Sequence, residues 1–464
     1  MSRLLALGQV GTLDDVRVWV GQMVEDAARE AARRREAVWV CARAEATGPL
    51  RDARWSVASP RLAWAFREPD GRLTLGWGEA LAARTEGTRA LSAATAALVA
   101  QGSHAQLPPD LWVGGGAAFE AGRSWRGFPD ASLVLPELTL RREPDGFGWW
   151  QLAARVSPHD SVAALAARLA ALVPAPPQPP QGACLLAARF VPKPERWRDE
   201  VAAVVRALDR GRVAKVVLAR AVDLAFAAPP ALDDVWAALT RDVDACAFVI
   251  RQGAGVFLGA SPETLVKVSG RQVYTQAVAG TERRERGMSQ LAASEKDRRE
   301  HRVVVDTIVR RLAPLVDNVA VQATAVRAAG PLNHLITPME GTLRPECSLD
   351  EVVAALHPTP AVGGEPPEAA RAWQRRLEAT PRGWYAGPVG LAPLGGGAGS
   401  GAGGAYYVGL RSAWIRGRQA RLYAGCGLVR GSDPDRELDE SSDKLGVMAW
   451  ALAGMAPAAA GRAL

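Results

Sequence analysis

Hydrophobic positions recur along this chain at two spacings, and each spacing predicts one type of element. Apolar residues three or four positions apart predict amphipathic helices over Leu13–Arg35, Glu86–Gln101, His159–Leu172 and Pro194–Arg210. Alternating or β-branched runs predict strands, which in residues 1–180 are Ala37–Arg43, Leu62–Phe66, Leu73–Trp77, Leu111–Ala118, Ser132–Leu140 and Gly148–Val156. Helices and strands mixed in this way predict an α+β fold.

A proline-rich segment, VPAPPQPPQ (Val173–Gln181), interrupts this pattern. Proline at this density is typical of a semi-rigid connector. The segment separates residues 1–180, an α+β part with little candidate chemistry, from residues 190–455, which carry almost all of it. It could equally be a long surface crossing within one fold.

The C-terminal part is predicted to be rich in strands. They cover Ala214–Phe226, Ala247–Ile250, Gly255–Leu258 and Gln272–Val278, and a later meander covers Trp384–Ala392, Ala405–Ile415 and Gln419–Leu428. A glycine-rich loop between the first two meander strands contains a GxGxxG pattern at Gly399–Gly404. A strand follows this pattern where a dinucleotide site requires a helix, so we expect a hairpin loop instead.

A helix near the C-terminus carries charge on a face that turns inward. Asp433 is a suitable N-cap and Pro434 a suitable first helical residue. Glu437, Glu440 and Lys444 then lie on one face, which continues as an apolar stripe. The acidic turn could be solvated and favoured by the helix dipole. Alternatively, the carboxylates could be buried, which requires a cation beside them.

A second helix repeats this arrangement. Ser294 opens a predicted capping box with Asp297, and the helix runs to about Leu312. Asp297 and Glu300 lie three residues apart on a face that becomes apolar further along. Mg²⁺ takes oxygen ligands, commonly one or two carboxylates with waters and ligand oxygens. Two such pairs therefore make a metal site a real alternative to two solvated faces.

Lysine is scarce in this chain. Of 56 basic residues only five are lysines, and a lysine can lose its proton whereas an arginine cannot. Lys215 lies at the start of a predicted strand, on the same face as small apolar residues. Its side chain could reach solvent, or it could be desolvated and serve as a general base.

Several polar residues in turns are further candidates. Glu263 follows a proline between two strands and is either an exposed turn residue or a general acid beside apolar walls. Gly280 and Thr281 offer N–H and hydroxyl donors to a carboxylate. Arg411, between small residues on a predicted strand, could bind a carboxylate or lie on the sheet surface. His334, and also His357, are either core histidines or pocket residues.

Composition excludes some classes of protein. The 464-residue chain has a net charge of +7, but no basic run is interleaved with aromatic residues, so we expect no nucleic-acid partner. No run of 18 uncharged apolar residues occurs, and the N-terminus becomes acidic too early for a signal peptide. Five scattered cysteines without metal-ligand spacing suit a reducing compartment. We therefore expect a cytoplasmic protein with no membrane segment.

Taken together, the motifs resemble those of the chorismate-utilising enzymes. The matching pieces are KVVLAR (Lys215–Arg220), GASPE (Gly259–Glu263), AGT (Ala279–Thr281), SEKDRREH (Ser294–His301), LNHL (Leu332–Leu335), HPTPAVGG (His357–Gly364), RGWYAGPVG (Arg382–Gly390) and the segment Ala424–Lys444. They occur in the order of the family across about residues 195–450, while residues 1–180 resemble isochorismate synthases more loosely.

This resemblance implies the fold and the reaction. The fold would consist of large antiparallel or mixed sheets packed face to face with helices outside, and the reaction would be Mg²⁺-dependent attack on chorismate with loss of the C4 hydroxyl. Family members that use water have a lysine at the position of Lys215, and those that use ammonia lack it. Aminodeoxychorismate synthases also have a lysine where this chain has Ala279. We therefore expect an isomerase, isochorismate synthase, for menaquinone or siderophore biosynthesis; salicylate synthase is the alternative, and anthranilate synthase is a weaker one.

The resemblance also implies roles for residues. Lys215 would be the base that activates water and Glu263 the acid that protonates the leaving hydroxyl. The Mg²⁺ ligands would be Glu300 and Glu440, supported through waters by Asp297 and Glu437. The substrate-binding residues would be Gly280, Thr281, His334, Tyr385, Arg411, Gly425 and Lys444. The protein is expected to act as a monomer on chorismate.

Overall fold

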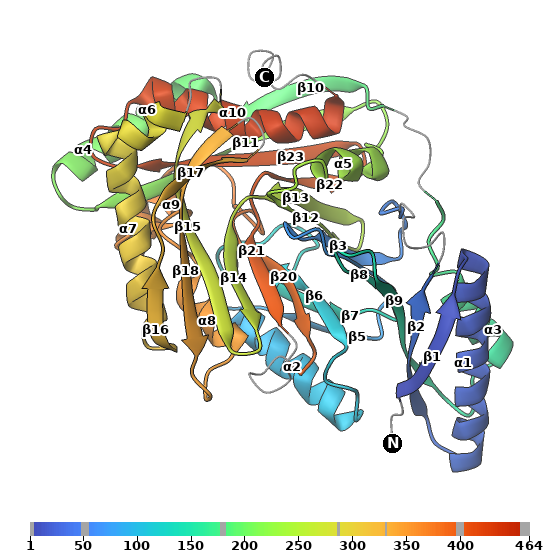
Figure 1. Cartoon of the computed structure of the whole chain (residues 1–464). Helices are drawn as coiled ribbons and strands as arrows, with labels where there is room; N and C mark the ends of the chain where they lie inside the picture. The colour runs from blue at the N-terminus through green and yellow to red at the C-terminus, as the bar shows by residue number, and fades with distance from the viewer. Residues whose placement is uncertain are drawn as a thin grey trace.

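The computed structural model describes residues 4–47, 55–176, 182–284, 288–329, 332–395 and 403–454. Two large sheets pack face to face, with helices on their outer sides (Figure 1). All strand pairs are antiparallel except the parallel pair at the N-terminal edge. These features confirm the predicted α+β class and its mixed, largely antiparallel sheets.

The first sheet runs from the N-terminal strands to the strand that begins with Lys215. Its order is β1 (Leu4–Val10), β2 (Val38–Ala46), β9 (Gly148–Val156), β8 (Leu138–Arg142), β4 (Leu73–Trp77), β3 (Leu62–Arg67), β12 (Cys246–Gln252), β13 (Gly255–Ser261), β22 (Ser412–Arg416), β23 (Gln419–Leu428), β11 (Lys215–Phe226) and β10 (Leu185–Val191), with β19 (Gly364–Glu365) also paired to β11.

The second sheet lies across the core from the first. Its order is β16 (Val316–Val321), β18 (Leu332–Leu343), β15 (Gln272–Arg283), β14 (Thr264–Ser269), β21 (Gly404–Val408), β20 (Pro388–Pro393), β6 (Trp112–Ala117), β7 (Ala131–Leu135) and β5 (Leu81–Thr85), with β17 (Ala325–Ala329) paired to β18.

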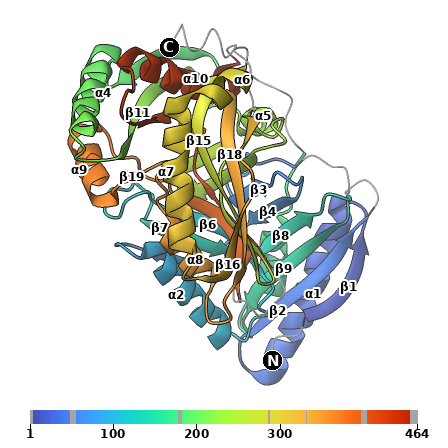
Figure 2. The same ribbon diagram turned by 60° about the vertical axis from the view of Figure 1, so that its left-hand side comes forward.

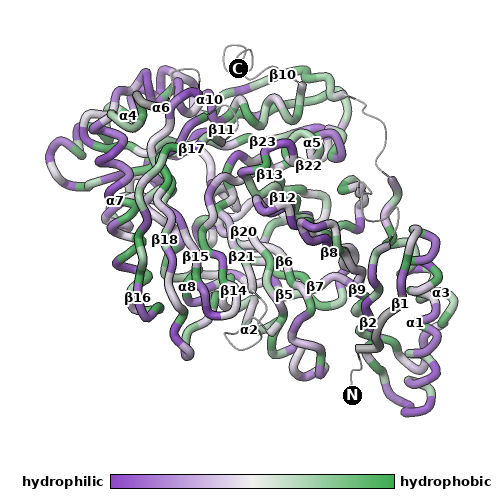
Figure 3. Tube along the Cα trace, viewed as in Figure 1, coloured by the Kyte–Doolittle hydropathy of each residue, from purple (hydrophilic) through white to green (hydrophobic). Residues whose placement is uncertain are grey.

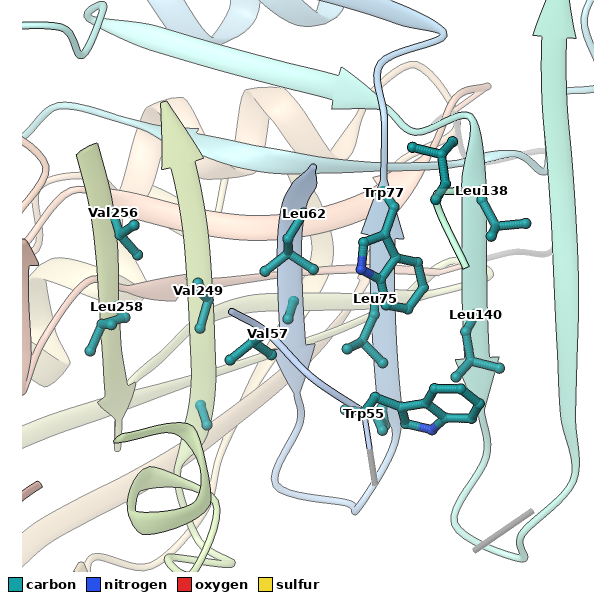
Figure 4. Packing of buried hydrophobic residues seen from close by; sticks show 14 of the residues in the cluster. Trp55, Val57, Leu62, Leu75, Trp77, Leu138, Leu140, Val249, Val256 and Leu258 are labelled. Carbon is teal, nitrogen blue, oxygen red and sulfur yellow. The ribbon is translucent and has the colours of Figure 1, made fainter. Parts of the chain in front are cut away.

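The alternation of side chains along the first sheet divides the core in two. Phe248 and Phe257 point to the interior between the sheets, where they meet residues of the second sheet. Val249, Val256 and Leu258 point to the opposite face, which the outer helices cover (Figure 4). The central strands β12 and β13 are therefore apolar on both faces, which explains their continuous hydrophobic runs.

Helices cover both outer faces (Figure 2). Those against the first sheet are α1 (Leu13–Arg34), α3 (Val162–Ala170), α4 (Pro194–Asp209), α5 (Leu232–Leu239), α9 (Pro367–Leu377) and α10 (Pro434–Ala453). Those against the second are α2 (Ala90–His104), α6 (Met288–Ala293), α7 (Glu295–Leu312) and α8 (Leu349–Leu356). Purple and green alternate along α1 and α7, as expected for helices with one buried face (Figure 3). Among the described residues, no helix is long and apolar enough to span a bilayer.

Two predicted elements were wrong in the same way. The single strand expected over Ser132–Leu140 is two strands in different sheets, because Pro136 lacks an N–H and ends β7. The predicted strand Ala405–Ile415 is also two, since β21 belongs to the second sheet and β22 to the first. The crossing bends at Arg411, whose φ is 45°. The predicted three-stranded meander is therefore a pair of two-stranded ladders.

Strands from both sides of the proline-rich segment contribute to both sheets. Residues 1–180 supply β1–β4, β8 and β9 to the first sheet and β5–β7 to the second. The N-terminal part thus shares its core with the rest of the chain. Residues 177–181 of the segment, and residues 396–402 of the glycine-rich loop, lie outside the described residues.

Candidate active site

The predicted site residues gather where the chain crosses between the sheets. Glu263 lies in the crossing from β13 to β14, and Arg411 lies in the crossing from β21 to β22. Lys215 is the first residue of β11 and is completely buried. The N-terminal halves of α7 and α10 bring the four predicted acidic residues to the same region, where charges on one helix act on those of the other.

Lys215 faces a carboxylate of α7. Its Nζ lies 2.9 Å from Oε1 of Glu300, which is also buried. Gly427 on β23 makes this pair possible, because a Cβ there would collide with Glu300 Oε1 and lie 2.8 Å from Lys215 Cε. The surface alternative for Lys215 is wrong, since the side chain does not reach solvent.

Glu263 is buried, so the exposed-turn alternative is also wrong. Its carboxylate accepts a hydrogen bond of 3.3 Å from Thr359 Oγ1. Burial raises the pKa of Glu263 to about 7, although the positive charges of Lys215, Lys444 and Arg411 oppose this shift. A carboxylic acid with a pKa near neutrality can hold a proton and release it during a reaction.

The acidic turn of α10 is buried beside two lysines. Glu437 is 1 % exposed, and Lys296 Nζ lies 2.6 Å from its Oε1. Lys444 Nζ lies 2.5 Å from Glu440 Oε1 on the same helix. Burial and the charge of Glu440 raise the pKa of Glu437 to about 7. Burial opposes ionisation of Glu440 too, but Lys444 and Lys296 hold its pKa below the ordinary value.

The carboxylates of α7 and α10 have the chemistry of a site for a hard cation. They supply only oxygen donors, which Mg²⁺ prefers. Burial and neighbouring carboxylates raise the pKa values of Glu437 and Asp297, and a bound cation would relieve this repulsion. Across the described ranges, no three His, Cys, Asp or Glu side chains are grouped closely enough to hold a metal ion, and lysines pair with Glu300, Glu437 and Glu440 instead. The assignment of these residues as ligands stays a prediction.

A neutral histidine on β18, His334, connects Arg411 to β15. Arg411 Nη2 donates to His334 Nε2 at 3.1 Å, and the other ring nitrogen lies 3.3 Å from the Gly280 carbonyl and 3.2 Å from Thr281 Oγ1. Because a guanidinium only donates, Nε2 must accept and the proton must lie on Nδ1. Burial, together with Arg411, lowers the pKa of His334 well below its usual value. Gly280, at a bulge with φ 75°, keeps its backbone close to this ring.

The tyrosine and glycine of the predicted substrate site lie side by side. Tyr385 is buried and its ring stacks on Tyr423 with 5.1 Å between centroids. A Cβ at Gly425 would lie 3.3 Å from the Tyr385 hydroxyl. Lys444 Nζ donates to the Gly425 carbonyl at 3.0 Å. Gly425 therefore leaves room beside a hydroxyl donor, and the adjoining ammonium adds positive charge.

The sequence interpretation missed three residues of this site. Lys296, Thr359 and Gly427 contact Glu437, Glu263 and Lys215–Glu300 respectively. The scarcity of lysine was a signal for Lys296, and the HPTPAVGG motif contained Thr359. No sequence signal marked Gly427, because only the approach of α7 to β23 gives it a role.

His357 lies elsewhere. Its ring meets Phe119 edge-on at 5.9 Å, and burial lowers its pKa to about 4. It lines a separate cavity of about 750 Å³ between α2, α8 and α9. Of the other three histidines, His104 and His159 are exposed as expected. His301 on α7 is buried, and its Nε2 lies 2.7 Å from Thr337 Oγ1.

Known proteins resemble this chain in sequence and in fold. Residues 59–453 match the family model described as chorismate binding enzyme. A salicylate biosynthesis isochorismate synthase of Pseudomonas aeruginosa is 35% identical over 350 residues, 71% of each chain. The isochorismate synthase MenF of Bacillus subtilis is 32% identical over 76% of each chain. The solved structure of the menaquinone-specific MenF of Escherichia coli superimposes with a TM-score of 0.76 and 26% identity, over 93% of this chain and 99% of that one.

Proposed function

This chain belongs to the family of chorismate-binding enzymes, and from that premise we infer that it is an isochorismate synthase, an isomerase that converts chorismate to isochorismate. Two relatives that are at least 32% identical over most of their lengths carry this name. The observation that carries the proposal is the buried Lys215, a potential base, whose charge acts on the buried Glu263, an acid with a pKa of about 7.

The reaction exchanges one hydroxyl for another. Water attacks C2 of the ring and forms a C–O bond while the C4–O bond breaks. Lys215, acting as the free amine, takes the proton of the attacking water. Glu263 gives a proton to the departing C4 hydroxyl, which leaves as water. One water enters and one leaves, so the net change is an isomerisation, and the proton gained by Lys215 balances the proton lost by Glu263.

The environment of Glu263 suits this role. Burial favours its protonated form. Thr359 contacts one carboxyl oxygen and limits the rotation of the group. The approach of a dianionic substrate adds negative charge and strengthens the preference for the protonated acid.

We propose that Mg²⁺ binds to Glu300 and Glu440, with Asp297 and Glu437 holding its waters. When bound, the cation would neutralise the ring carboxylate of chorismate and fix its orientation. Lys296 and Lys444 offset the remaining charge of the acidic residues. With the cation and the two lysines in place, the substrate carboxylate can approach the acidic residues of α7 and α10.

The second carboxylate of chorismate would be held by a separate set of donors. Arg411 supplies a charged donor and Tyr385 a hydroxyl donor. Thr281 supplies a second hydroxyl, and the backbone at Gly280 and Gly425 supplies N–H groups. His334 can donate only from Nδ1, so it acts as a neutral support for Arg411. We further propose that the protein acts as a cytoplasmic monomer, which light scattering of the purified protein would check for the oligomeric state.

An assay with chorismate and Mg²⁺, without ammonia, tests the function. Products are separated by chromatography, and isochorismate alone is expected. Salicylate together with pyruvate would identify a salicylate synthase instead. Anthranilate that forms only when ammonia is added would identify an anthranilate synthase. Unchanged chorismate over a range of Mg²⁺ concentrations would refute all three.

A further inference from the structure

A buried arginine lies behind the acidic turn of α10. Arg220 is on β11, five residues after Lys215, and therefore points to the opposite face of the sheet. That face is covered by α4 and α10, which lies along β11 and β23 in Figures 1 and 2. The Arg220 side chain is 2 % exposed. Arg220 therefore lies buried between β11 and the helices that cover it.

The guanidinium holds three groups of α10. Its Nε donates to Ser441 Oγ at 2.8 Å, and its Nη2 donates to Ser442 Oγ at 2.5 Å and to the Leu438 carbonyl at 3.2 Å. Both serine hydroxyls also donate to the Leu438 carbonyl. A single planar group thus fixes one and a half turns of the helix, which a flexible ammonium could not do.

The three residues that accept hydrogen bonds from Arg220 alternate along α10 with the charged residues of the candidate site. Leu438 follows Glu437 directly, and Ser441 and Ser442 lie between Glu440 and Lys444. Because successive residues turn by about 100° around a helix axis, gripping these residues determines where the acidic face points. Rotation of α10 by one residue would move Glu437 and Glu440 away from Glu300.

Burying the charge of Arg220 without an ion-pair partner in the described part of the chain costs free energy, which a purely structural role does not require. Burial lowers its pKa to about 10, so the group is still charged at neutral pH. No carboxylate forms an ion pair with it within the described ranges, and Nη1 has no hydrogen-bond partner there. Besides the α10 groups, the rings of Phe190 and Trp197 lie 5.5 and 5.8 Å from the charge, and Asp439 acts on it without forming an ion pair. An apolar side chain at such a position is commonly as stable or more stable.

We propose that Arg220 is a positioning residue that sets the rotation of α10 and thereby aims Glu437, Glu440 and Lys444 at the cation and the substrate. This inference rests on the proposed function. Arg220 touches neither substrate nor cation, and it acts through the α10 backbone and two serine hydroxyls. It joins the strand of the base, Lys215, to the helix of the predicted cation ligands.

The test compares Arg220→Met with the wild type and with a matched control, Arg251→Met. Arg251 is a half-buried arginine of the first sheet that, like Arg220, has no ion pair among the described residues. It donates to the Ala58 carbonyl, far from α10 in the chain. Isochorismate formation is measured against Mg²⁺ and chorismate concentration, Mg²⁺ binding by calorimetry, and exchange of α10 amides by mass spectrometry.

For Arg220→Met we expect about a tenfold or larger rise in the Mg²⁺ dissociation constant, as for other residues that orient ligands. We also expect faster exchange in residues 437–445 and a larger change in KM than in kcat. Arg251→Met should match the wild type in all three measurements. Ser442→Ala should shift Mg²⁺ binding in the same direction by a smaller factor, and it keeps the test valid if Arg220→Met does not fold.

Wild-type Mg²⁺ affinity and wild-type KM in both Arg220→Met and Ser442→Ala would overturn the proposal, even if the melting temperature fell. A wrong assignment of the function would give a different result from a wrong role for Arg220. In that case the wild type itself makes no isochorismate, whereas Mg²⁺ binding and exchange still report on Arg220.

Discussion

Two clusters of charged side chains among the described residues, one partly exposed and one in the candidate site, differ in how completely each carboxylate is matched by cations. The first lies at the ends of β3, β4 and β8. There Glu143 accepts from Arg72 at 2.7 Å and from Arg141 at 2.9 Å, and Lys267 Nζ lies 2.7 Å from Asp70. Despite burial, these partners hold the pKa values of Asp70 and Glu143 below their usual range.

In the second cluster, at the candidate site, the neighbouring cations do not fully offset the effect of burial on the carboxylates. Burial raises the pKa values of Glu263 and Glu437 to about 7, and that of Asp297 is also raised. Both clusters contain lysines and arginines, so the difference is one of arrangement. The first cluster resembles a structural ion-pair network. The second leaves carboxylates able to exchange protons or accept a cation, which acid–base chemistry requires.

The largest expected difference is between two lysines, the buried Lys215 of the candidate site and the partly exposed Lys267 of the first cluster. Lys215→Gln should lower kcat by about 10²–10⁴-fold, because the general base is lost. Lys267→Gln removes the lysine of the structural cluster and should leave kcat within about twofold, with a stability loss of about 1 kcal/mol or less. Chorismate turnover and urea unfolding of both variants make the comparison. Equal activity of the two variants would remove the distinction between the clusters.

Glu263→Gln is expected to have the second-largest effect on turnover. The amide cannot donate the proton, so kcat should fall by about 10²–10³-fold while KM changes only a few-fold. In the wild type, kcat should fall as pH rises through the pKa of Glu263, about 7 in the free protein, because the acid loses its proton. A kcat that stays constant between pH 6 and 9 would contradict the assignment of Glu263 as the acid.

The pKa of Glu263 also affects stability. The pKa of Glu263 in the folded state is raised above its ordinary value of 4.5, so the folded state binds the proton more tightly, and stability falls as pH rises from about 4.5 to about 7. Glu263→Gln should remove this fall, by up to about 3 kcal/mol. Unfolding free energies of wild type and variant at pH 5 and pH 8 measure it, and identical pH dependence would show that burial does not shift this group.

Gly427→Ala tests the packing of the site. The added methyl collides with Glu300, so Lys215 and Glu300 must separate, and a stability loss of about 1–3 kcal/mol with strongly reduced turnover is expected. Gly21→Ala is the control: nothing lies within 4 Å of its Cβ, and alanine in a helix should stabilise α1 by up to about 1 kcal/mol. Thermal unfolding and turnover distinguish the two glycines.

The smallest effect on turnover is expected for Glu143→Gln. Loss of a carboxylate bonded to two arginines should cost about 1–3 kcal/mol at neutral pH. Because the folded pKa of Glu143 is depressed, its contribution is present above the unfolded pKa and disappears as pH falls through the folded value. The variant should therefore approach wild-type stability in acid while its kcat at pH 7 is unchanged. A large fall in kcat would show that the two clusters are coupled.

Much of the fold could be predicted from local patterns. The helix expected over Leu13–Arg35 is α1, and the strands Leu73–Trp77 and Gly148–Val156 have the predicted bounds. The α10 start was also predicted, since Asp433 accepts from the N–H groups of Asp435 and Arg436. The errors lie where a strand leaves one sheet for the other, because hydrophobic runs look alike in both sheets.

By itself the sequence determined the residue types of the site. It identified a scarce lysine, a turn glutamate, two acidic helix starts and the ordered motifs of a known family. Only the tertiary structure decided which of these groups are buried and which are matched by a partner. Arg411 illustrates this, since its role depends on a crossing between sheets that puts it 3.1 Å from His334. The physical reason is that burial and charge matching depend on groups far apart in the chain, which no local pattern contains.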